Sequence, residues 1–386
     1  MDKKKILFIV SNMESGGVSK SMTSLLNAMD TTQYEVDIFI TNPSGVFMEL
    51  IPSDINKIVD KRTQLLLSSF PKNLVKLLKD GFILSFFIRM IVASCMVFNK
   101  AYGAWILSRF IYKINKEYDL AVDYNGQHQL YYLVDFIKAK KKVSFFHSDY
   151  SQWNYYYAMD KKYYSKIDEI FTISEICVTA LKKYFPNEKH KIGLFENISS
   201  PILIEKLAHQ LQPDMVANSI LSVGHLSLAK GTALALEVAF ILKNRKVDFK
   251  WYFIGADSKD KDYLKLVEEY NIQENIVFLG VLVNPYPYIK AAKMIAHLSY
   301  FEGKSIALDE AKIMKKPVVV TQFSTVSDQF KEDFNASICD FNAVKIADSI
   351  EELFNNKELC NKYSSNLNLE SIDNSSEIKK LYKLID

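Results

Sequence analysis

The chain alternates short apolar runs with stretches of helical periodicity, and this alternation begins twice, near residue 6 and again near residue 220. The first run, at 6–10, is followed by a polar loop that ends in Gly16 and Gly17 and by a helical pattern at 18–29. A continuous apolar run is typical of a parallel strand that is covered on both faces. The repeated order of strand, loop and helix predicts an α/β fold built from two doubly wound, Rossmann-like domains.

The remaining segments continue this order in each half of the chain. In the first half, a helix is predicted from the N-cap Ser174 to about residue 184. Residues ~60–118 look mostly helical and are apolar on more than one face. Further strands are predicted at 34–40, 120–123, 143–146 and 170–173 in the first half, and at 220–223, 249–254, 276–279, 294–298 and 317–320 in the second.

The length of the chain also requires more than one domain. Its 386 residues exceed the roughly 250–300 at which a single hydrophobic core stops growing. We place one domain at 1–197 and a second at 198–375, and we expect a C-terminal helix at 376–386 that packs back on the first domain. Two such domains facing each other would hold a ligand in the cleft between them.

Composition excludes several classes of protein. Apolar residues make up 49% of the chain, which excludes a disordered protein, and the net charge of +3 gives no global field for nucleic acid. The four cysteines lie far apart without C-x-x-C spacing, so neither a disulfide framework nor a zinc site is predicted. This use of cysteine fits a reducing cytoplasm, where we expect the protein to be. The longest uncharged run in the basic segment, 90–99, is far below the ~18 residues of a spanning helix, so no transmembrane helix is predicted.

The segment 61–116 has a strongly uneven charge. It contains ten basic residues and one acid, Asp80, interleaved with aromatic and aliphatic side chains. Such a segment suits peripheral contact with an anionic membrane at its inner face. It equally suits a buried helical layer whose lysines reach the rim, and the pattern does not decide between the two.

Five blocks in the second half, taken in order, resemble glycosyltransferase family 4, the retaining enzymes of the GT-B architecture. They lie at 222–231 (SVGHLSLAKG), 253–255, 277–280 together with 284–289, 300–311 (YFEGKSIALDEA) and 316–320. The N-terminal half matches more loosely, at Gly16-Gly17 and around His147. The resemblance implies a C-terminal domain that binds a nucleotide diphosphate sugar and an N-terminal domain that binds the acceptor.

Glu302 and Glu310 are separated by seven residues, and a helix is predicted to start between them at Ser305. The amides of Gly303, Lys304, Ser305 and Ile306 at such a helix N-terminus suit a diphosphate. Glu310, two turns into the helix, can accept hydrogen bonds from a ribose diol. Glu302, before the helix, can face the sugar, and the resemblance implies these same roles.

A phosphate-binding loop is predicted before the second helical pattern. Lys230 matches the family's donor-phosphate lysine and would neutralise charge on the leaving diphosphate. His225 stands where the family usually has arginine, and histidine cannot grip a diphosphate bidentately. We expect Lys304 to compensate.

The N-terminal half offers candidates of its own. The resemblance places Gly16 and Gly17 beside the donor phosphates, where glycine allows close approach or positive φ. His147 follows a strand, and the family often uses a histidine there against the transferred sugar. Asp149, Trp153 and the strand-end residue Asp123 are weaker candidates for acceptor contact.

The resemblance thus implies transfer of a sugar, most commonly from a uridine diphosphate sugar, to a glycan or lipid-linked acceptor in bacterial surface-polysaccharide or capsule assembly. No cofactor and no metal are expected, because basic residues would neutralise the diphosphate. Two other functions stay open. A non-catalytic GT-B partner subunit is suggested by His225, and a sugar-nucleotide epimerase can share the architecture.

Overall fold

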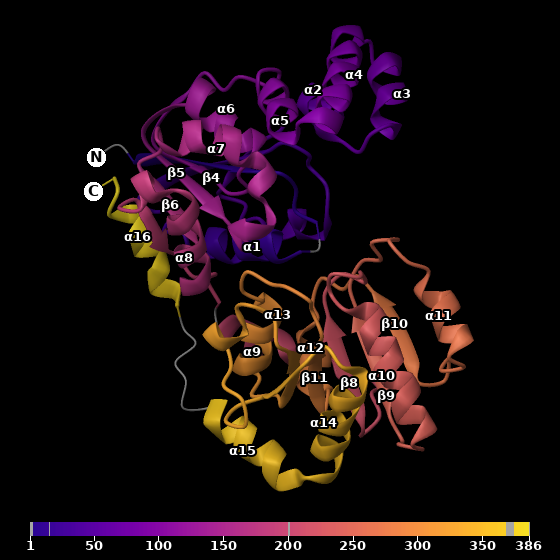
Figure 1. The fold of residues 1–386 in the computed structure, drawn as a ribbon. Coiled ribbons are helices and arrows are strands. Elements are labelled where there is room, and N and C mark those ends of the chain that lie inside the picture. The colour runs from indigo at the N-terminus through magenta and orange to yellow at the C-terminus, as the bar shows by residue number, and fades with distance from the viewer. Residues whose placement is uncertain (1–2, 15, 200, 368–373, 386) are drawn as a thin grey trace. The chain divides into compact units, whose positions relative to one another are not determined.

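The computed structural model describes residues 3–14, 16–199, 201–367 and 374–385, which form two compact units (Figure 1). The N-terminal unit contains the residues up to Glu14, the span Val18–Asn197 and the segment from Ser376 onward. The C-terminal unit contains Ile198–Ser375.

The N-terminal unit is built on a seven-stranded parallel sheet with the order β3-β2-β1-β4-β5-β6-β7. The central strand β1 pairs with β2 on one side and β4 on the other, and its residues Ile6 to Val10 are at most 2% exposed. The predicted apolar run therefore forms a strand that is covered on both faces. The strands are β1 (Lys4–Val10), β2 (Tyr34–Ile40), β3 (Asn56–Ile58), β4 (Glu117–Asp123), β5 (Lys138–Phe146), β6 (Glu169–Thr172) and β7 (Ile192–Leu194).

Helices alternate with these strands. The predicted N-cap is confirmed at Ser174, whose side chain accepts a hydrogen bond from the Cys177 amide at 3.2 Å. The helices are α1 (Gly17–Ala28), α2 (Lys61–Leu67), α3 (Lys72–Lys79), α4 (Ile83–Phe98), α5 (Lys100–Ser108), α6 (His128–Phe136), α7 (Tyr157–Tyr164), α8 (Glu175–Tyr184) and α16 (Lys379–Tyr382).

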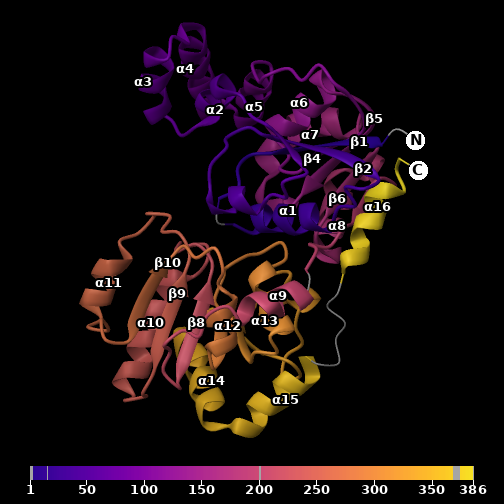
Figure 2. The same cartoon turned by 180° about the vertical axis from the view of Figure 1, so that it is seen from behind.

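The helical segment predicted at ~60–118 is confirmed as α2 to α5. A small core of its own, centred on Leu66, Ile88, Val92 and Leu107, holds these helices together. In both views α3 and α4 lie side by side at the edge of the N-terminal unit, beyond α2 and α5 (Figures 1 and 2). No helix in the described part of the chain is long and apolar enough to cross a membrane.

The C-terminal unit has a six-stranded parallel sheet with the order β10-β9-β8-β11-β12-β13. Neighbouring side chains of β8 point to opposite faces, so Ile220 and Leu221 belong to two separate cores. One core packs against α10, α11 and α14, and the other against α9, α12 and α13. The strands are β8 (Ser219–Val223), β9 (Lys250–Ile254), β10 (Ile276–Gly280), β11 (Met294–His297), β12 (Val318–Thr321) and β13 (Ser337–Cys339).

The helices of this unit cover both faces of the sheet, as the doubly wound pattern predicts. They are α9 (Pro201–Ala208), α10 (Thr232–Asn244), α11 (Tyr263–Glu269), α12 (Tyr286–Ala291), α13 (Ile306–Ile313), α14 (Ala343–Asn355) and α15 (Lys357–Leu367).

The strand order reverses beside β8. The chain continues from β8 to β9 on one side and later returns to β11 on the other side. Parallel sheets bind ligands at the carboxyl ends of the strands where the order reverses. This position lies between the loop 224–231 after β8 and the loop 298–305 after β11.

The last segment of the chain belongs to the N-terminal unit. The Tyr382 ring stacks on Tyr34 with 4.3 Å between ring centroids, and its hydroxyl accepts a hydrogen bond from the Asp30 amide at 2.9 Å. Lys380 donates to the Leu194 carbonyl at 2.8 Å. These contacts join α16 to β2, β7 and the end of α1.

Candidate functional site in the C-terminal unit

Two loops meet at the strand reversal because a glycine allows their backbones to touch. Gly231 has φ of +69°, and a Cβ added there would lie 1.9 Å from the Leu298 carbonyl oxygen. The Tyr300 amide also donates to the Ala229 carbonyl at 2.9 Å. The loop that carries Lys230 is therefore held against the loop that carries Glu302.

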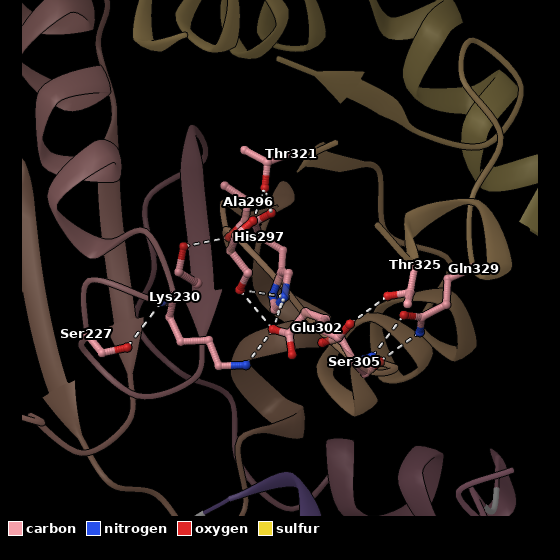
Figure 3. A network of polar contacts seen from close by, with 11 residues as sticks. Ser227, Lys230, Ala296, His297, Glu302, Ser305, Thr321, Thr325 and Gln329 are labelled. Atoms are coloured by element: carbon pink, nitrogen blue, oxygen red, sulfur yellow. Dashed lines mark hydrogen bonds and ion pairs between the residues drawn. The ribbon is translucent and has the colours of Figure 1, made fainter. Parts of the chain in front are cut away.

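Glu302 receives three hydrogen bonds on one oxygen, Oε1 (Figure 3). Lys230 Nζ lies 2.5 Å from this atom, His297 Nε2 lies 2.9 Å from it, and Ser299 Oγ donates to it at 2.8 Å. The residue is 8% exposed. No protein group among the described residues bonds Oε2, so this oxygen is available to a ligand hydroxyl.

The charge of Glu302 is set by two opposing effects. Burial alone raises the pKa of its carboxyl, but the Lys230 ammonium and the hydrogen bond with His297 outweigh it and hold the pKa at about 2. Glu302 is thus a carboxylate at neutral pH. A buried carboxylate that is paired on only one oxygen is a strong hydrogen-bond acceptor.

Polar side chains behind the loop fix its backbone. Thr325 Oγ1 donates to the Glu302 carbonyl at 2.9 Å, and Thr321 Oγ1 donates to the Ser299 carbonyl at 2.6 Å. The Gln329 amide bonds both the amide and the carbonyl of Ser305, at 2.9 and 2.8 Å. The helix predicted from Ser305 is α13, which begins at Ile306 with Ser305 as its N-cap. The Ser305 amide, predicted to bind a diphosphate, instead donates to Gln329 and does not form part of an open anion site.

Glu310 lies in the second turn of α13 and is 1% exposed. The Tyr286 hydroxyl, at the start of α12, donates to its Oε1 at 3.0 Å. Burial and the neighbouring carboxylate raise the pKa of Tyr286 well above its ordinary value, so the phenol keeps its proton and remains a donor. The hydroxyl of Tyr286 on α12 therefore orients the carboxylate of Glu310 on α13.

Further candidates line the same strand reversal. A pocket is bordered by Gly224, His225, Lys230, His297 and Ser299. The His225 side chain is exposed there. Gly303 is buried in the Glu302 loop, while Lys304 and Ile306 are partly buried. The structure thus brings Lys230, Glu302 and His225 to one place.

The N-terminal candidates occupy the carboxyl end of the other sheet. Gly17 begins α1, and neither it nor Gly16 adopts the positive φ that glycine allows. A Cβ on Gly16 would meet no atom within 4 Å, so its backbone is open to close approach.

His147 follows β5 directly. Its ring packs against Tyr124 and Phe145, with centroid distances of 4.5 and 5.7 Å. Burial lowers the pKa of His147 to about 3, so the imidazole is neutral. Its Nε2 is buried without a hydrogen-bond partner among the described residues, which is a costly arrangement that a ligand would relieve.

The prediction that Asp123 faces an acceptor needs correction. This residue is 0% exposed, and its carboxyl accepts hydrogen bonds from the amides of Asn125 and Gly126 and from Ser144 Oγ, at 2.8 to 3.0 Å. Burial raises its pKa to about 7 against the effect of these bonds. Asp123 therefore holds the turn between β4 and α6.

The weaker acceptor candidates also make local bonds. Asp149 accepts a hydrogen bond from the Ser151 amide at 2.9 Å, and Trp153 Nε1 donates to Ser148 Oγ at 3.2 Å. Both side chains remain partly exposed.

Residues 204–368 match the family model described as glycosyl transferases group 1. The C-terminal unit is a group 1 glycosyltransferase domain. The family resemblance stated from the sequence is confirmed by this match, and the fold by solved structures. A TarM variant from Staphylococcus aureus, in complex with fondaparinux, α-GlcNAc-glycerol and UDP, aligns over 100% of both chains with a TM-score of 0.71 and 14% identity. The two Rossmann-like units therefore have the GT-B fold.

Curated relatives match part of the chain. A poly(ribitol-phosphate) α-N-acetylglucosaminyltransferase of Staphylococcus aureus is 28% identical over 148 residues, which are 37% of this chain and 30% of that protein. An N-acetylgalactosamine-N,N'-diacetylbacillosaminyl-diphospho-undecaprenol 4-α-N-acetylgalactosaminyltransferase of Campylobacter jejuni is 30% identical over 160 residues, 41% of this chain and 42% of that protein. The matched region thus spans less than half the length of either relative.

Three residues of the group 1 domain orient Glu302 and Glu310 but were not predicted from the sequence. His297 and Ser299 bind Glu302, and Tyr286 binds Glu310. His297 ends β11, so the rule that drew attention to His147, a polar side chain at a strand's carboxyl end, also applied to it. Tyr286 had no such signal, because its contact with Glu310 depends on the packing of α12 on α13.

Proposed function

We propose that this protein is a retaining glycosyltransferase that moves a sugar from a nucleotide diphosphate sugar to a glycan or lipid-linked acceptor in surface-polysaccharide assembly. The observation that carries the proposal is the partly buried Lys230–Glu302 ion pair at the strand reversal of a group 1 domain. It combines a cation for a diphosphate with a carboxylate oxygen, Oε2, for a sugar hydroxyl.

Lys230 is assigned to the diphosphate. Its side chain is 34% exposed, so its ammonium can exchange the Glu302 carboxylate for phosphate oxygens when a donor binds. His297 and Ser299 keep their bonds to Oε1 and so keep Glu302 in place. A fixed cation at the leaving group favours the transition state, in which negative charge grows on the diphosphate.

Glu310 is assigned to the ribose of the donor. With Oε1 held by Tyr286, the carboxylate is oriented in advance of binding. A uridine diphosphate sugar is the donor we propose, supported by the TarM variant whose crystal contains UDP. The lipid-linked acceptor is supported by the Campylobacter relative, whose name specifies a diphospho-undecaprenol substrate.

The proposed reaction is a front-face substitution. The bond from the anomeric carbon to the diphosphate oxygen breaks as the acceptor oxygen bonds the same face of that carbon, and the departing diphosphate oxygen takes the acceptor's proton. The configuration is therefore retained. The protein positions both substrates and stabilises the leaving group, and Lys230 supplies this stabilisation without a metal ion. The buried Nε2 of His147, in the N-terminal unit, is assigned to the transferred sugar.

The decisive experiment measures nucleotide diphosphate release by the full chain with a panel of nucleotide sugars and sugar acceptors. Glu302→Gln should abolish turnover, whereas Glu268→Gln, an exposed acid on α11, should not. Nuclear magnetic resonance of the product should show the donor's anomeric configuration. A donor at 100 times its Kd should also stabilise the chain by about 2.7 kcal/mol.

Two results would contradict the proposed glycosyltransferase activity and indicate a different function. Interconversion of nucleotide sugars without an acceptor would identify an epimerase. Absence of both turnover and thermal stabilisation with every donor would identify a non-catalytic partner subunit, which the unusual His225 first suggested.

A further inference from the structure

The helices α3 and α4 present large apolar side chains to solvent. Leu84 is 71% exposed, Phe87 is 57% exposed and Phe98 is 90% exposed. Contiguous exposed apolar surface of this kind marks an interaction site in a folded protein. We define the α3–α4 surface as the exposed residues Val75, Leu78, Ile83, Leu84, Phe87, Met90, Ile91, Val97 and Phe98, with the three lysines of α3.

The helix α4 distributes its polar and apolar side chains in the opposite way to an ordinary surface helix. Its inward face carries the polar residues Ser85 and Arg89 beside Ile88 and Val92. Its outward face carries apolar residues at helical spacing from Ile83 to Phe98. An ordinary surface helix buries its apolar stripe and exposes its polar one. The outward face of α4 is therefore suited to an apolar environment.

The charge beside this apolar face is positive. Lys72, Lys76 and Lys79 on α3 are exposed, and no ion pair involves them among the described residues. The one acid between residues 61 and 116 is Asp80, which pairs with Lys61 at 3.2 Å. The surface thus combines apolar side chains with unpaired cations, which complements a partner that is apolar and anionic.

A second copy of the chain is a poor partner for this surface. In a two-fold symmetric dimer the same patch meets itself, so the lysines of α3 would face lysines with no free acid to pair them. An anionic lipid bilayer offers both features at one boundary, with negative headgroups above an acyl interior.

We propose that the α3–α4 surface docks the N-terminal unit on a bilayer that contains anionic lipids. The helix α4 lies in the plane of the interface with Leu84, Phe87 and Ile91 among the acyl chains, while the lysines of α3 contact the headgroups. It lies on the membrane and does not cross it, since no described helix is long enough to span. This inference does not depend on the proposed sugar transfer.

The test is sedimentation of the full chain with vesicles of phosphatidylcholine mixed with phosphatidylglycerol, and with vesicles of phosphatidylcholine alone. The chain should bind the mixed vesicles, and added salt should weaken binding. Leu84→Glu combined with Phe87→Glu should abolish it. Lys76→Gln and Lys79→Gln should each weaken binding by about fivefold, because a lysine near an anionic surface contributes ~1 kcal/mol.

The matched control is Leu264→Glu on α11 of the C-terminal unit. Leu264 is 66% exposed, close to the 71% of Leu84, but lies outside the α3–α4 surface, so this variant should bind vesicles as the native chain does. All substituted positions are exposed, and circular dichroism should show unchanged folding. A second measurement uses Phe87→Trp, whose fluorescence should be quenched by brominated lipids if the side chain enters the acyl region.

Three results would overturn the proposal. The first is equal absence of binding to both kinds of vesicle. The second is binding to anionic vesicles without quenching of the tryptophan at position 87, which would show a purely electrostatic contact. The third is a native dimer in the absence of lipid that Leu84→Glu with Phe87→Glu converts to a monomer, which would identify a second copy as the occupant. Because the assay contains no donor, none of these results bears on the proposed function.

Discussion

Replacing Lys230 by methionine tests how the charge of Glu302 is maintained. Methionine keeps an unbranched side chain but removes the cation 2.5 Å from Glu302 Oε1. The variant leaves a buried carboxylate with His297 and Ser299 as its partners. Removing one partner of a buried ion pair is costly because the other charge stays buried.

The size of the effect follows from the pKa of Glu302. This pKa falls from an ordinary 4.5 to about 2 in the folded chain, and a tenfold change in proton affinity equals about 1.4 kcal/mol. The folded environment therefore favours the carboxylate by about 3 kcal/mol. Because Lys230 is one-third exposed and His297 shares the interaction, we assign about 2 kcal/mol to Lys230.

The sign of the pH dependence follows from the lowered pKa. In the native chain this stabilisation is present above about pH 4.5 and is lost as the pH falls toward about 2. In Lys230→Met, burial is less strongly opposed and the pKa of Glu302 rises. The difference in unfolding free energy between the two proteins should therefore be greatest near neutral pH and shrink in acid.

Urea unfolding at several pH values measures this difference. Trp251 is fully buried in the C-terminal unit, so substituting Trp105 and Trp153 by phenylalanine makes it the sole tryptophan reporter of that unit. The control Lys265→Met removes a lysine whose side chain is 69% exposed and should change stability by less than about 0.5 kcal/mol.

A double-mutant cycle with Glu302→Gln completes the test. Glu302→Gln should destabilise the native chain but not the Lys230→Met variant, because the amide needs no counter-charge. A loss of stability that does not vary with pH, or a coupling energy near zero, would refute the reasoning.

Three further predictions concern donor binding and the loop contact. Glu310→Gln should raise the donor KM at least tenfold while the Tyr286 bond preserves the fold, and steady-state kinetics with an unchanged KM would contradict the ribose assignment. Lys304→Ala should raise the donor KM strongly if this lysine compensates for His225, and an unchanged value in the same assay would reject that role. Gly231→Ala should destabilise the C-terminal unit by at least about 1–3 kcal/mol in thermal unfolding, since its Cβ would overlap the Leu298 carbonyl; native stability would show that the loops separate easily.

The fold could be predicted where apolar runs are long enough to show a pattern. The buried strands β1 and β2 and the helix after Ser174 were predicted because they contain several periodic residues or a capping signal. The edge strands β3, β7 and β13 have three residues each, too few for a periodicity. The orientation of α4 was also open, since a helix that is apolar on both faces does not indicate which face is buried.

The site could be predicted in part. Lys230 and Glu302 lie in blocks with a recognisable order, but their ion pair depends on the close approach of two loops 72 residues apart. Asp123 is a residue whose role was predicted incorrectly from its position at the end of a strand. A polar residue at a strand end either faces the ligand side or satisfies the turn that follows, and this choice depends on neighbouring amides and on Ser144.

The contacts of α16 mean that the N-terminal unit cannot be completed until the end of the chain has been synthesised. The stacking of Tyr382 on Tyr34 and the bond of Lys380 to the Leu194 carbonyl complete the N-terminal unit with residues that the ribosome adds after the whole C-terminal unit. Multidomain chains generally fold from the N-terminus during translation. Here the first unit to begin is the last to be completed, because Tyr34 and the Leu194 carbonyl lack these partners until α16 has been synthesised.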